Sequence, residues 1–510
     1  MSFATRTRRL LYLIHRWMGV AACVLMALWF VSGIVMLFVG YPKFTPWERL
    51  GALPALQANS IRVPLTRVLD AIDVPVSEVV LTSIGGRPCY RLQLRDGRLI
   101  AVDAASGTRL SVDTAHLLAS ARSFLSQVTA QDRGLVQEDR WTHSRALDPH
   151  RPLHVIDMHD PDRTRLYLSS VTGEVVLDAP RAQRGWNYVG AWLHWLYYFR
   201  DRPIDPVWSW IVIVLSAAGT LVAISGTVVG IWRWRFSGHY KSGGHSPYRE
   251  SWLRWHHILG LAFAAIIFTW IFSGLMSMNP VGIFDARGQK PDLAAWRNGD
   301  PVVDRLPLQA GAAVSLLEQH GFRAVEIYWR VLNGQPYLLA RNAKADTRLI
   351  VLGEDGSPTV RTQWDRSTLL HAATRLMAST IASQQELARY DNYYYARQPE
   401  AMMGAAERRL PVLRVRFTDA HATWSYIDPF TGEVALSVDR AQRAGRWLFN
   451  FLHSWDVPVM LTSGIGRDVI LILLSLGGLA MSITGVVIGY ARLRIWSNKQ
   501  GKKRPIATRA

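Results

Sequence analysis

Four long runs without a charged side chain constrain this chain more than any other feature of its sequence. They contain no Asp, Glu, Lys or Arg and cover Trp17–Val39, Val207–Trp232, Ile258–Phe284 and Val469–Ala491. Each run reaches the ~20 residues that an α-helix needs to cross a ~30 Å hydrocarbon core. The first run is longer than the ~7–15 apolar residues of a signal peptide, so we interpret it as a retained anchor. The sequence therefore predicts a membrane α-helical protein with four transmembrane helices.

The formal net charge of +19 is concentrated next to these runs. The segment before Trp17 carries four arginines and no acid, the segment between the second and third runs carries five basic residues and one acid, and the segment after the fourth run carries seven basic residues and no acid. By the positive-inside rule, all three segments face the cytoplasm, which places both termini there and the two long connections in the periplasm. We attribute the charge to this orientation in a bacterial inner membrane rather than to nucleic-acid binding.

These observations define eight segments of the chain. The segments are the cytoplasmic N-terminus with the first span (1–40), the first periplasmic domain with an interfacial helix (41–206), the second span (207–236), a cytoplasmic loop (237–251), the third span (252–284), the second periplasmic domain with an interfacial helix (285–466), the fourth span (467–495) and a basic cytoplasmic tail (496–510).

The two halves of the chain resemble each other at both ends. At one constant offset, the near end repeats five residues, His15, Gly19, Trp29, Ser32 and Gly33, as His256, Gly260, Trp270, Ser273 and Gly274. At a second offset, the far end repeats Thr172-Gly173-Glu174, His194, Gly226 and Gly230 as Thr431-Gly432-Glu433, His453, Gly485 and Gly489. The pattern predicts a tandem duplication of a helix–soluble domain–helix unit, with the copies related by a pseudo-two-fold axis along the membrane normal.

The soluble segments have the alternation of an α+β fold. Residues 91–94 and 97–103 alternate as a β-hairpin, and residues 165–168 and 172–176 alternate as a second one. Between them, residues 114–127 have the apolar spacing of a helix. We therefore expect a four-helix membrane bundle that carries two α+β periplasmic domains.

Histidines at the ends of the spans are the main candidates for chemistry. His15 and His256 lie at the cytoplasmic ends of the first and third spans, and His194 and His453 lie just before the second and fourth. A two-fold axis brings each residue opposite its copy, so the repeat predicts two bis-histidine pairs at two depths. A haem iron takes two axial ligands on opposite faces, which facing helices supply. The alternative interpretation is that these histidines only anchor the helices at the membrane interface.

Other histidines give weaker signals. His257 is an alternative to His256 as a ligand, although its counterpart in the repeat is Arg16. A periplasmic cluster of His143, His150, His154 and His159 has the composition of a metal site, but the second half of the chain does not repeat it, and we interpret these residues as solvated surface histidines. A transporter is disfavoured, since the spans lack charged residues and breaks.

Five motifs of the chain resemble those of a known family. They are the His15-Arg16-Trp17-x-Gly19 start, the Ser32-Gly33 exit, the Tyr167…Thr172-Gly173-Glu174 turn, the Arg184…His194 segment and the Ser225-Gly226 span. Together they resemble the PepSY-associated transmembrane-helix family. These iron-regulated membrane proteins include dihaem siderophore reductases of the bacterial inner membrane. The resemblance implies PepSY-like periplasmic domains, two b-type haems with His15, His194, His256 and His453 as axial ligands of the iron, and reduction of a ferric siderophore or another periplasmic iron complex.

The resemblance also sets the partners that we expect. The cytoplasmic segments are too short for a flavin or nicotinamide domain and contain no Gly-x-Gly-x-x-Gly motif that opens a helix. Electrons must therefore come from outside the chain, from a quinol in the lipid bilayer or from a cytoplasmic reductase. The alternative function is a non-redox PepSY module that binds or regulates periplasmic proteases.

Overall fold

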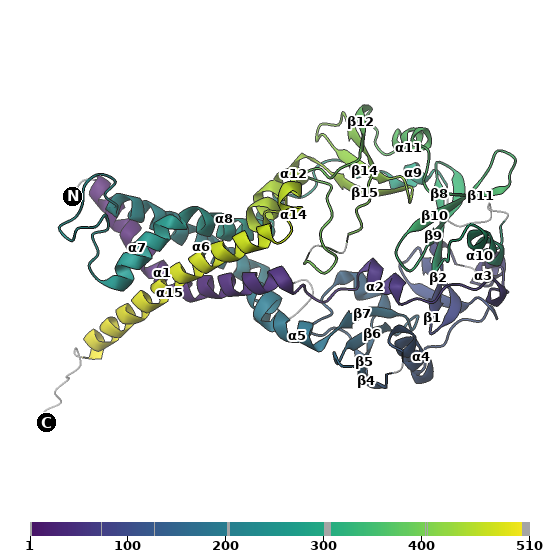
Figure 1. Cartoon of the computed structure of the whole chain (residues 1–510), viewed down its shortest axis with the longest axis horizontal. Coiled ribbons are helices and arrows are strands. Elements are labelled where there is room, and N and C mark those ends of the chain that lie inside the picture. The colour runs from purple at the N-terminus through teal and green to yellow at the C-terminus, as the bar shows by residue number, and fades with distance from the viewer. Residues whose placement is uncertain are drawn as a thin grey trace, which may run out of the picture. The chain divides into compact units, whose positions relative to one another are not determined.

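The computed structural model describes residues 3–72, 74–126, 128–200, 205–299, 308–402, 404 and 406–501. It divides into two compact units (Figure 1). The helical unit consists of Met1–Val39, Trp186–Asp285 and Gln442–Ala510, and the sheet unit consists of Gly40–Gly185 and Ala286–Ala441. Most of the predicted basic tail, residues 502–510, lies outside the described residues.

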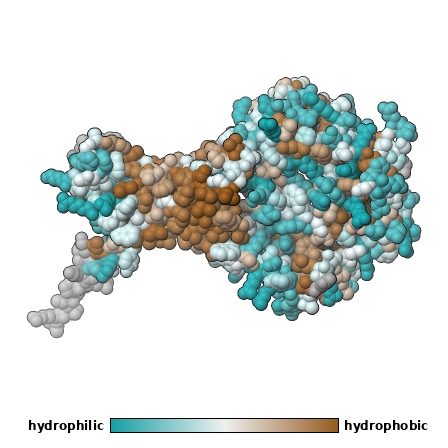
Figure 2. All heavy atoms as spheres, viewed as in Figure 1, coloured by the Kyte–Doolittle hydropathy of each residue, from teal (hydrophilic) through white to brown (hydrophobic). Residues whose placement is uncertain are grey.

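Long apolar helices form the helical unit. Within the described part of the chain, three continuous helices are long and apolar enough to cross a membrane: α1 (Phe3–Phe38), α6 (Pro206–Arg233) and α15 (Gly466–Gly501). A fourth candidate span is the pair of α7 (Ser251–Ala262) and α8 (Ala264–Ser277), which bends by 69°. Figure 2 shows apolar residues covering most of the visible surface of these helices. The chain is therefore a membrane protein with three or four candidate spans.

The bend at Phe263 corrects the expectation of four unbroken spans. A Cβ atom added to Gly477 of α15 would lie 2.1 Å from the ring of Phe263, and one added to Gly478 would lie 2.3 Å from the ring of Phe30 on α1. Two adjacent glycines therefore let α15 approach both aromatic rings closely, and the helix breaks where one of these rings packs. Because α7 and α8 form a broken helix, the lack of charged side chains in the spans is the remaining feature that disfavours a transporter.

The helices pack in a pattern that follows the repeat in the sequence. Helix α1 contacts α6 and α15, while α7 contacts α15 and α8 contacts α6. The pair of α7 and α8 in the second half of the chain therefore corresponds to α1 in the first half. The core between the helices is apolar and contains Met26, Phe30, Val222, Ala223, Ile267, Ile271 and Met481.

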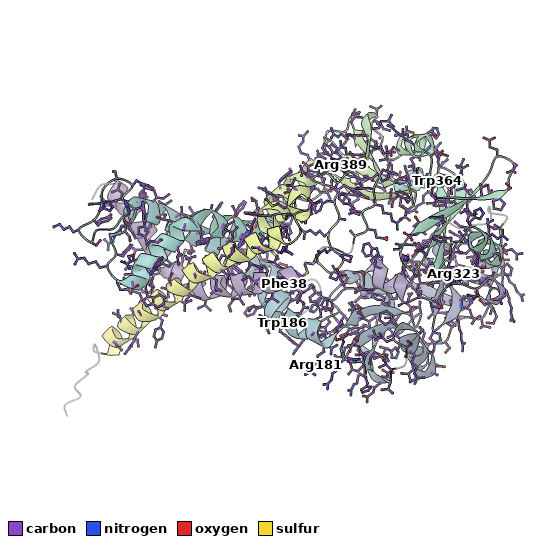
Figure 3. The ribbon with its side chains drawn as sticks, in the orientation of Figure 1. Phe38, Arg181, Trp186, Arg323, Trp364 and Arg389 are labelled. Carbon is purple, nitrogen blue, oxygen red and sulfur yellow. The ribbon has the colours of Figure 1, made fainter. Side chains whose placement is uncertain are left out.

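Short helical segments connect the long helices. These are α5 (Arg181–Asn187), a π-helical turn (Tyr188–Trp192), 3₁₀ turns (Tyr197–Phe199 and Pro280–Gly282), α12 (Arg440–Gly445), a second π-helical turn (Arg446–Phe451), α13 (Leu452–Ser454) and α14 (Pro458–Leu461). The two π-helical turns occupy corresponding positions of the two halves. Figure 3 labels Phe38, the last residue of α1, and Trp186 in α5.

Antiparallel sheets build the sheet unit. A seven-stranded sheet has the order β11-β10-β9-β8-β1-β2-β3, and two four-stranded sheets have the orders β4-β5-β6-β7 and β12-β13-β14-β15. The strands are β1 (Val76–Ile84), β2 (Arg87–Leu94), β3 (Leu99–Asp103), β4 (Ala130–Val136), β5 (Leu153–Met158), β6 (Arg165–Ser169), β7 (Val175–Ala179), β8 (Glu326–Leu332), β9 (Gln335–Arg341), β10 (Thr347–Leu352), β11 (Pro358–Arg361), β12 (Ile381–Leu387), β13 (Val412–Phe417), β14 (Trp424–Asp428) and β15 (Glu433–Val438).

Helices cover these sheets. They are α2 (Pro46–Gly51), α3 (Leu65–Ile72), α4 (Thr114–Phe124), α9 (Leu293–Arg297), α10 (Ala310–Gln319) and α11 (Arg366–Ala373), with 3₁₀ turns at Ala58–Ser60 and Arg145–His150. The predicted hairpins are confirmed as β2–β3 and β6–β7, and the predicted helix is confirmed as α4. The α+β class of the soluble segments is therefore confirmed.

The two soluble segments share one sheet. Strand β1 of the first segment pairs antiparallel with β8 of the second, with Val80 opposite Tyr328 and Leu81 opposite Ile327. The sequence predicts two domains, one in each segment. In the structure each segment forms a four-stranded sheet of its own, but the remaining strands join across β1 and β8 into a continuous seven-stranded sheet.

The repeated Thr-Gly-Glu turns attach each small sheet to the large one. Glu174 accepts a hydrogen bond from Nη1 of Arg91 on β2 at 3.1 Å, and Glu433 accepts one from Nε of Arg330 on β8 at 3.1 Å. The glycine of each turn has a positive φ, 76° at Gly173 and 71° at Gly432. At Gly432 an added Cβ would lie 2.6 Å from Nε1 of Trp364, labelled in Figure 3, so a side chain there would displace the ring.

A buried ion pair lies at the seam of the shared sheet. Glu326 on β8 is fully buried and pairs through both carboxylate oxygens with Arg49 of α2. The same carboxylate accepts hydrogen bonds from Thr82 of β1 at 3.0 Å and from Tyr328 at 2.6 Å. Burial alone would raise the pKa of Glu326, but the guanidinium groups of Arg49 and Arg91 and the Tyr328 hydrogen bond outweigh burial and lower the pKa to about 2.

We predict that this carboxylate makes the sheet unit sensitive to acid. Because the pKa of Glu326 is lower in the folded state than the ordinary 4.5, its contribution is complete above pH 4.5 and is lost as the pH falls towards 2. One pKa unit corresponds to about 1.4 kcal/mol, so Glu326→Gln should lower the unfolding free energy at pH 7 by about 3 kcal/mol and have little effect near pH 2. Thermal unfolding of the full chain in detergent, followed across this pH range, measures the difference.

The control is Glu318→Gln, which changes an exposed carboxylate on α10. An effect of Glu326→Gln that stays constant from pH 7 to pH 2 would contradict the predicted role of the ion pair.

Candidate functional site

His15 and His256 lie next to each other inside the helical unit. His15 comes from α1 and His256 from α7, and their ring centroids are 6.2 Å apart with an angle of 37° between the ring planes. Both line a cavity of about 340 Å³. The repeat predicts this pairing, and the structure brings the two rings together.

His194 and His453 form the second predicted pair. Their ring centroids are 5.9 Å apart and their planes are at 72°. Each histidine follows one of the π-helical turns. Two residues after each histidine the backbone is left-handed, at Leu196 with φ 55° after His194 and at Trp455 with φ 48° after His453. Positive φ is uncommon for such bulky side chains, and π-helical turns and strained residues cluster at functional sites.

Hydrogen bonds at Nδ1 orient the second pair. The hydroxyl of Ser32 donates to the carbonyl of Leu28 at 2.8 Å, so its oxygen accepts a hydrogen bond from Nδ1 of His194 at 3.0 Å. In the other half, Ser273 donates to the carbonyl of Trp270 and accepts from Nδ1 of His453, both at 3.0 Å. The two serines are repeated residues of the sequence, but the repeat alone does not indicate that they bind the histidines.

Nδ1 is also hydrogen-bonded in the first pair, but through different partners. Nδ1 of His256 lies 2.9 Å from the hydroxyl of Thr484, which itself donates to the carbonyl of Met481. Nδ1 of His15 lies 3.2 Å from the carbonyl of Val222. In all four rings the proton is thus held at Nδ1, which points to Nε2 as the nitrogen for a metal.

The geometry of both pairs fits one metal ion between two imidazoles. An imidazole nitrogen binds a metal at about 2 Å. Two rings that coordinate one iron from opposite faces therefore have centroids about 6 Å apart. The observed separations of 6.2 and 5.9 Å agree with this value.

The repeated glycines lie beside the imidazoles. A Cβ atom added to Gly226 would lie 2.5 Å from Cε1 of His15, and one added to Gly485 would lie 3.5 Å from Cε1 of His256. The corresponding distances from Gly33 to His194 and from Gly274 to His453 are both 3.9 Å. Any side chain at Gly226 would displace the His15 ring. The glycines therefore leave space for the imidazole rings, and the residues present fit a group that is held by two histidines.

His257 is engaged elsewhere in the fold. Its side chain is buried, its Nε2 donates to the carbonyl of Gly230 at 2.8 Å, and its Nδ1 lies 2.9 Å from the hydroxyl of Ser246. The ring also contacts the edges of Trp234 and Tyr248. Both nitrogens thus tie the loop after α6 to the helix ends, which favours His256 over His257 as the candidate ligand.

The four histidines of the first soluble segment do not converge. His143 contacts Glu138, His150 lies 3.7 Å from Glu174, His154 lies 3.7 Å from Asp132, and Nδ1 of His159 lies 3.2 Å from the carbonyl of Thr129. Among the described residues, no group of three or more His, Cys, Asp and Glu side chains could hold a metal ion. The interpretation of all four as solvated is wrong, because His143, His150 and His154 are largely buried against carboxylates.

Comparison with known proteins gives one match. A family model described as "PepSY-associated TM region" matches residues 12–313, which is more than half of the chain. The matched region contains His15, His194 and His256. A search of curated proteins found no match.

We predict that His257 holds the loop between α6 and α7 in place and does not bind a ligand. His257→Ala removes two hydrogen bonds of a buried ring, so the free energy of opening the loop should fall by about 1–3 kcal/mol. Faster hydrogen exchange of the amides in residues 234–250 would measure this change. His239→Ala, at an exposed position of the same loop, is the matched control. Unchanged exchange in His257→Ala would contradict the assignment.

Proposed function

We propose that this chain, which belongs to the family of PepSY-associated TM proteins, carries electrons across the bacterial inner membrane on two b-type haems and reduces ferric siderophores. Each haem would have two axial histidines, His15 with His256 and His194 with His453. The observation that carries the proposal is the arrangement of these four imidazoles. They occur as two pairs, and the distance between the ring centroids of each pair fits two imidazoles that coordinate one metal ion. Every ring also has a hydrogen bond at Nδ1.

The electron balance defines what the chain needs from outside. A haem iron supplies reversible one-electron exchange when it is bound. A ferric siderophore takes one electron to become the ferrous complex, which binds its iron more weakly. A quinol gives up two electrons and two protons, so one quinol serves two ferric ions. A cytoplasmic reductase is the other class of donor.

The residues of the chain position the cofactor and exclude water. Two imidazoles hold an iron in a fixed position, and their Nδ1 hydrogen bonds restrict ring rotation. Apolar residues buried between the helices, among them Met26, Phe30 and Met481, would keep water away from an electron path between the two pairs. Because the four runs carry no charged side chain, a positively charged iron centre has no competing ion pair within the spans.

The proposed topology has four crossings. Helix α1 contacts α6 and α15, and the pair of α7 and α8 contacts the same two helices. This likeness supports treating α7 and α8 together as one bent span. Basic residues flank the ends of α1, α6, α7 and α15 that meet the short segments. With these ends in the cytoplasm, both soluble segments lie in the periplasm.

The first test is the absorption spectrum of the purified chain. We expect a reduced-minus-oxidised difference spectrum of b-type haem with two haems per chain. His15→Ala and His194→Ala should each remove about half of the bound haem, and the double variant should remove all of it, because each histidine serves a different iron. His371→Ala, an exposed histidine of the sheet unit, is the control. A folded wild-type chain without haem would contradict the proposal and favour the alternative function, a non-redox module that binds proteases.

A second test uses the serine hydroxyls. Ser32→Ala and Ser273→Ala remove the partner of Nδ1 while leaving both imidazoles in place, and loss of such a partner typically weakens metal binding about 10–100-fold. We expect faster loss of haem from the His194–His453 site, measured by transfer to apomyoglobin. Ser277→Ala is the control, because this hydroxyl lies one helical turn away and bonds only to the carbonyl of Gly274 in the structure. Equal rates for Ser32→Ala and Ser277→Ala would argue against the role of the hydrogen bond.

A further inference from the structure

The cavity beside His15 and His256 has a strongly one-sided charge. Among its lining residues there is no Asp or Glu, whereas three arginines line it: Arg16, Arg233 and Arg492. A cavity with this lining attracts anions, because no carboxylate within it compensates the three cations. All three arginines are exposed, so they lie where the cavity meets solvent and remain available to a ligand.

Two of these arginines are copies of each other. Arg233 follows Gly230 by three residues, and Arg492 follows Gly489 by three residues, so both belong to the same offset that relates His194 to His453. Arg233 ends α6 and Arg492 lies on the corresponding helix α15. The pseudo-two-fold axis that exchanges His15 with His256 therefore also exchanges Arg233 with Arg492.

The chemical structure of a b-type haem has a matching symmetry. Its two propionate side chains lie on one edge of the ring and are related by an approximate two-fold axis through the iron in the ring plane. This axis also exchanges the two axial positions. A site with two-fold-related histidines and two-fold-related arginines thus presents one cation to each carboxylate.

We propose that Arg233 and Arg492 bind the two propionates of the haem that His15 and His256 hold, so that this edge of the ring faces the cytoplasmic mouth of the cavity. The inference rests on the proposed function and adds the residues that fix the orientation of the cofactor. A guanidinium pairs with a carboxylate through two parallel hydrogen bonds, which gives direction as well as affinity.

The surroundings of Arg233 support a defined orientation. Its Nε donates to the hydroxyl of Tyr12 at 2.9 Å, and its guanidinium lies over the rings of Tyr12 at 5.3 Å and Tyr248 at 5.7 Å. Both tyrosines also line the cavity. The terminal Nη atoms take no part in the Tyr12 bond, so they are the atoms that reach a carboxylate.

The third arginine differs from this pair. The counterpart of Arg16 in the repeat is His257, whose nitrogens bind Ser246 and the carbonyl of Gly230. Arg16 therefore has no partner of its own type across the axis. We assign one propionate each to Arg233 and Arg492 and none to Arg16.

The test compares two porphyrins in one chain. The full-length variant His194→Ala/His453→Ala retains only the site of His15 and His256, and in detergent it is titrated with haemin and with haemin dimethyl ester, which lacks the carboxylates. We expect at least tenfold tighter binding of haemin, since a hydrogen bond to a charged group contributes about 1.5–3 kcal/mol. Arg233→Gln and Arg492→Gln, added singly, should each weaken haemin binding about tenfold and leave ester binding unchanged.

The ester serves as an internal control for folding, because a variant that binds the ester normally has an intact histidine pair. Arg235→Gln is the matched control, because Arg235 stacks on Tyr240 and does not line the cavity. If haemin stays tenfold preferred in the variant that lacks both arginines, the inference is overturned and the proposed function stands. If the starting variant binds neither porphyrin, while the wild type holds no haem, both are overturned.

Discussion

A helix within a lipid bilayer satisfies its own backbone hydrogen bonds, and any polar side chain there must find its partner inside the protein. The four paired imidazoles of this chain meet that constraint in one way: each has an acceptor at Nδ1, supplied by a hydroxyl or a carbonyl of a neighbouring helix. Each hydroxyl in turn donates a hydrogen bond to a backbone carbonyl. The hydrogen-bond chains therefore end within the helices, and none of the four Nδ1 contacts uses the Nε2 atom of a ring.

The two halves share the residues that the sequence repeats, and small departures from the repeat make the two histidine pairs different. The pair of His194 and His453 has a serine on each side, in equivalent positions. The pair of His15 and His256 has a carbonyl on one side and Thr484 on the other, although Ser225 stands where Thr484 would be expected from the repeat. Ser225 donates to the carbonyl of Val222, the same carbonyl that His15 contacts. A carbonyl and a hydroxyl polarise an imidazole differently, so the two halves of this site are electronically unequal.

The pairing of the histidines could be predicted from the sequence, because a constant offset implies a symmetry axis and the axis determines which residues face each other. The hairpins of the soluble segments were predictable from local alternation, as β2–β3 and β6–β7 confirm. The bend at Phe263 was not, since the sequence around it contains no proline, and the glycine that accepts its ring lies more than 200 residues later. The left-handed residues after His194 and His453 also lack a local signal, because Leu196 and Trp455 are neither glycine nor asparagine. His150 and His154 were misjudged because their carboxylate partners, Glu174 and Asp132, come from a distant turn and a neighbouring strand.

The pairing of β1 with β8 has a consequence for the synthesis of the chain. Strand β1 leaves the ribosome with β2 and β3 but without its other neighbour, because β8 begins at Glu326, 242 residues after β1 ends at Ile84. At about 5–20 residues per second, translation of that interval takes roughly 10–50 s. During this time the edge of β1 presents unpaired backbone groups and an apolar face, a surface on which other chains can add a strand. The first half of the chain therefore has an incomplete sheet until the second half has been synthesised.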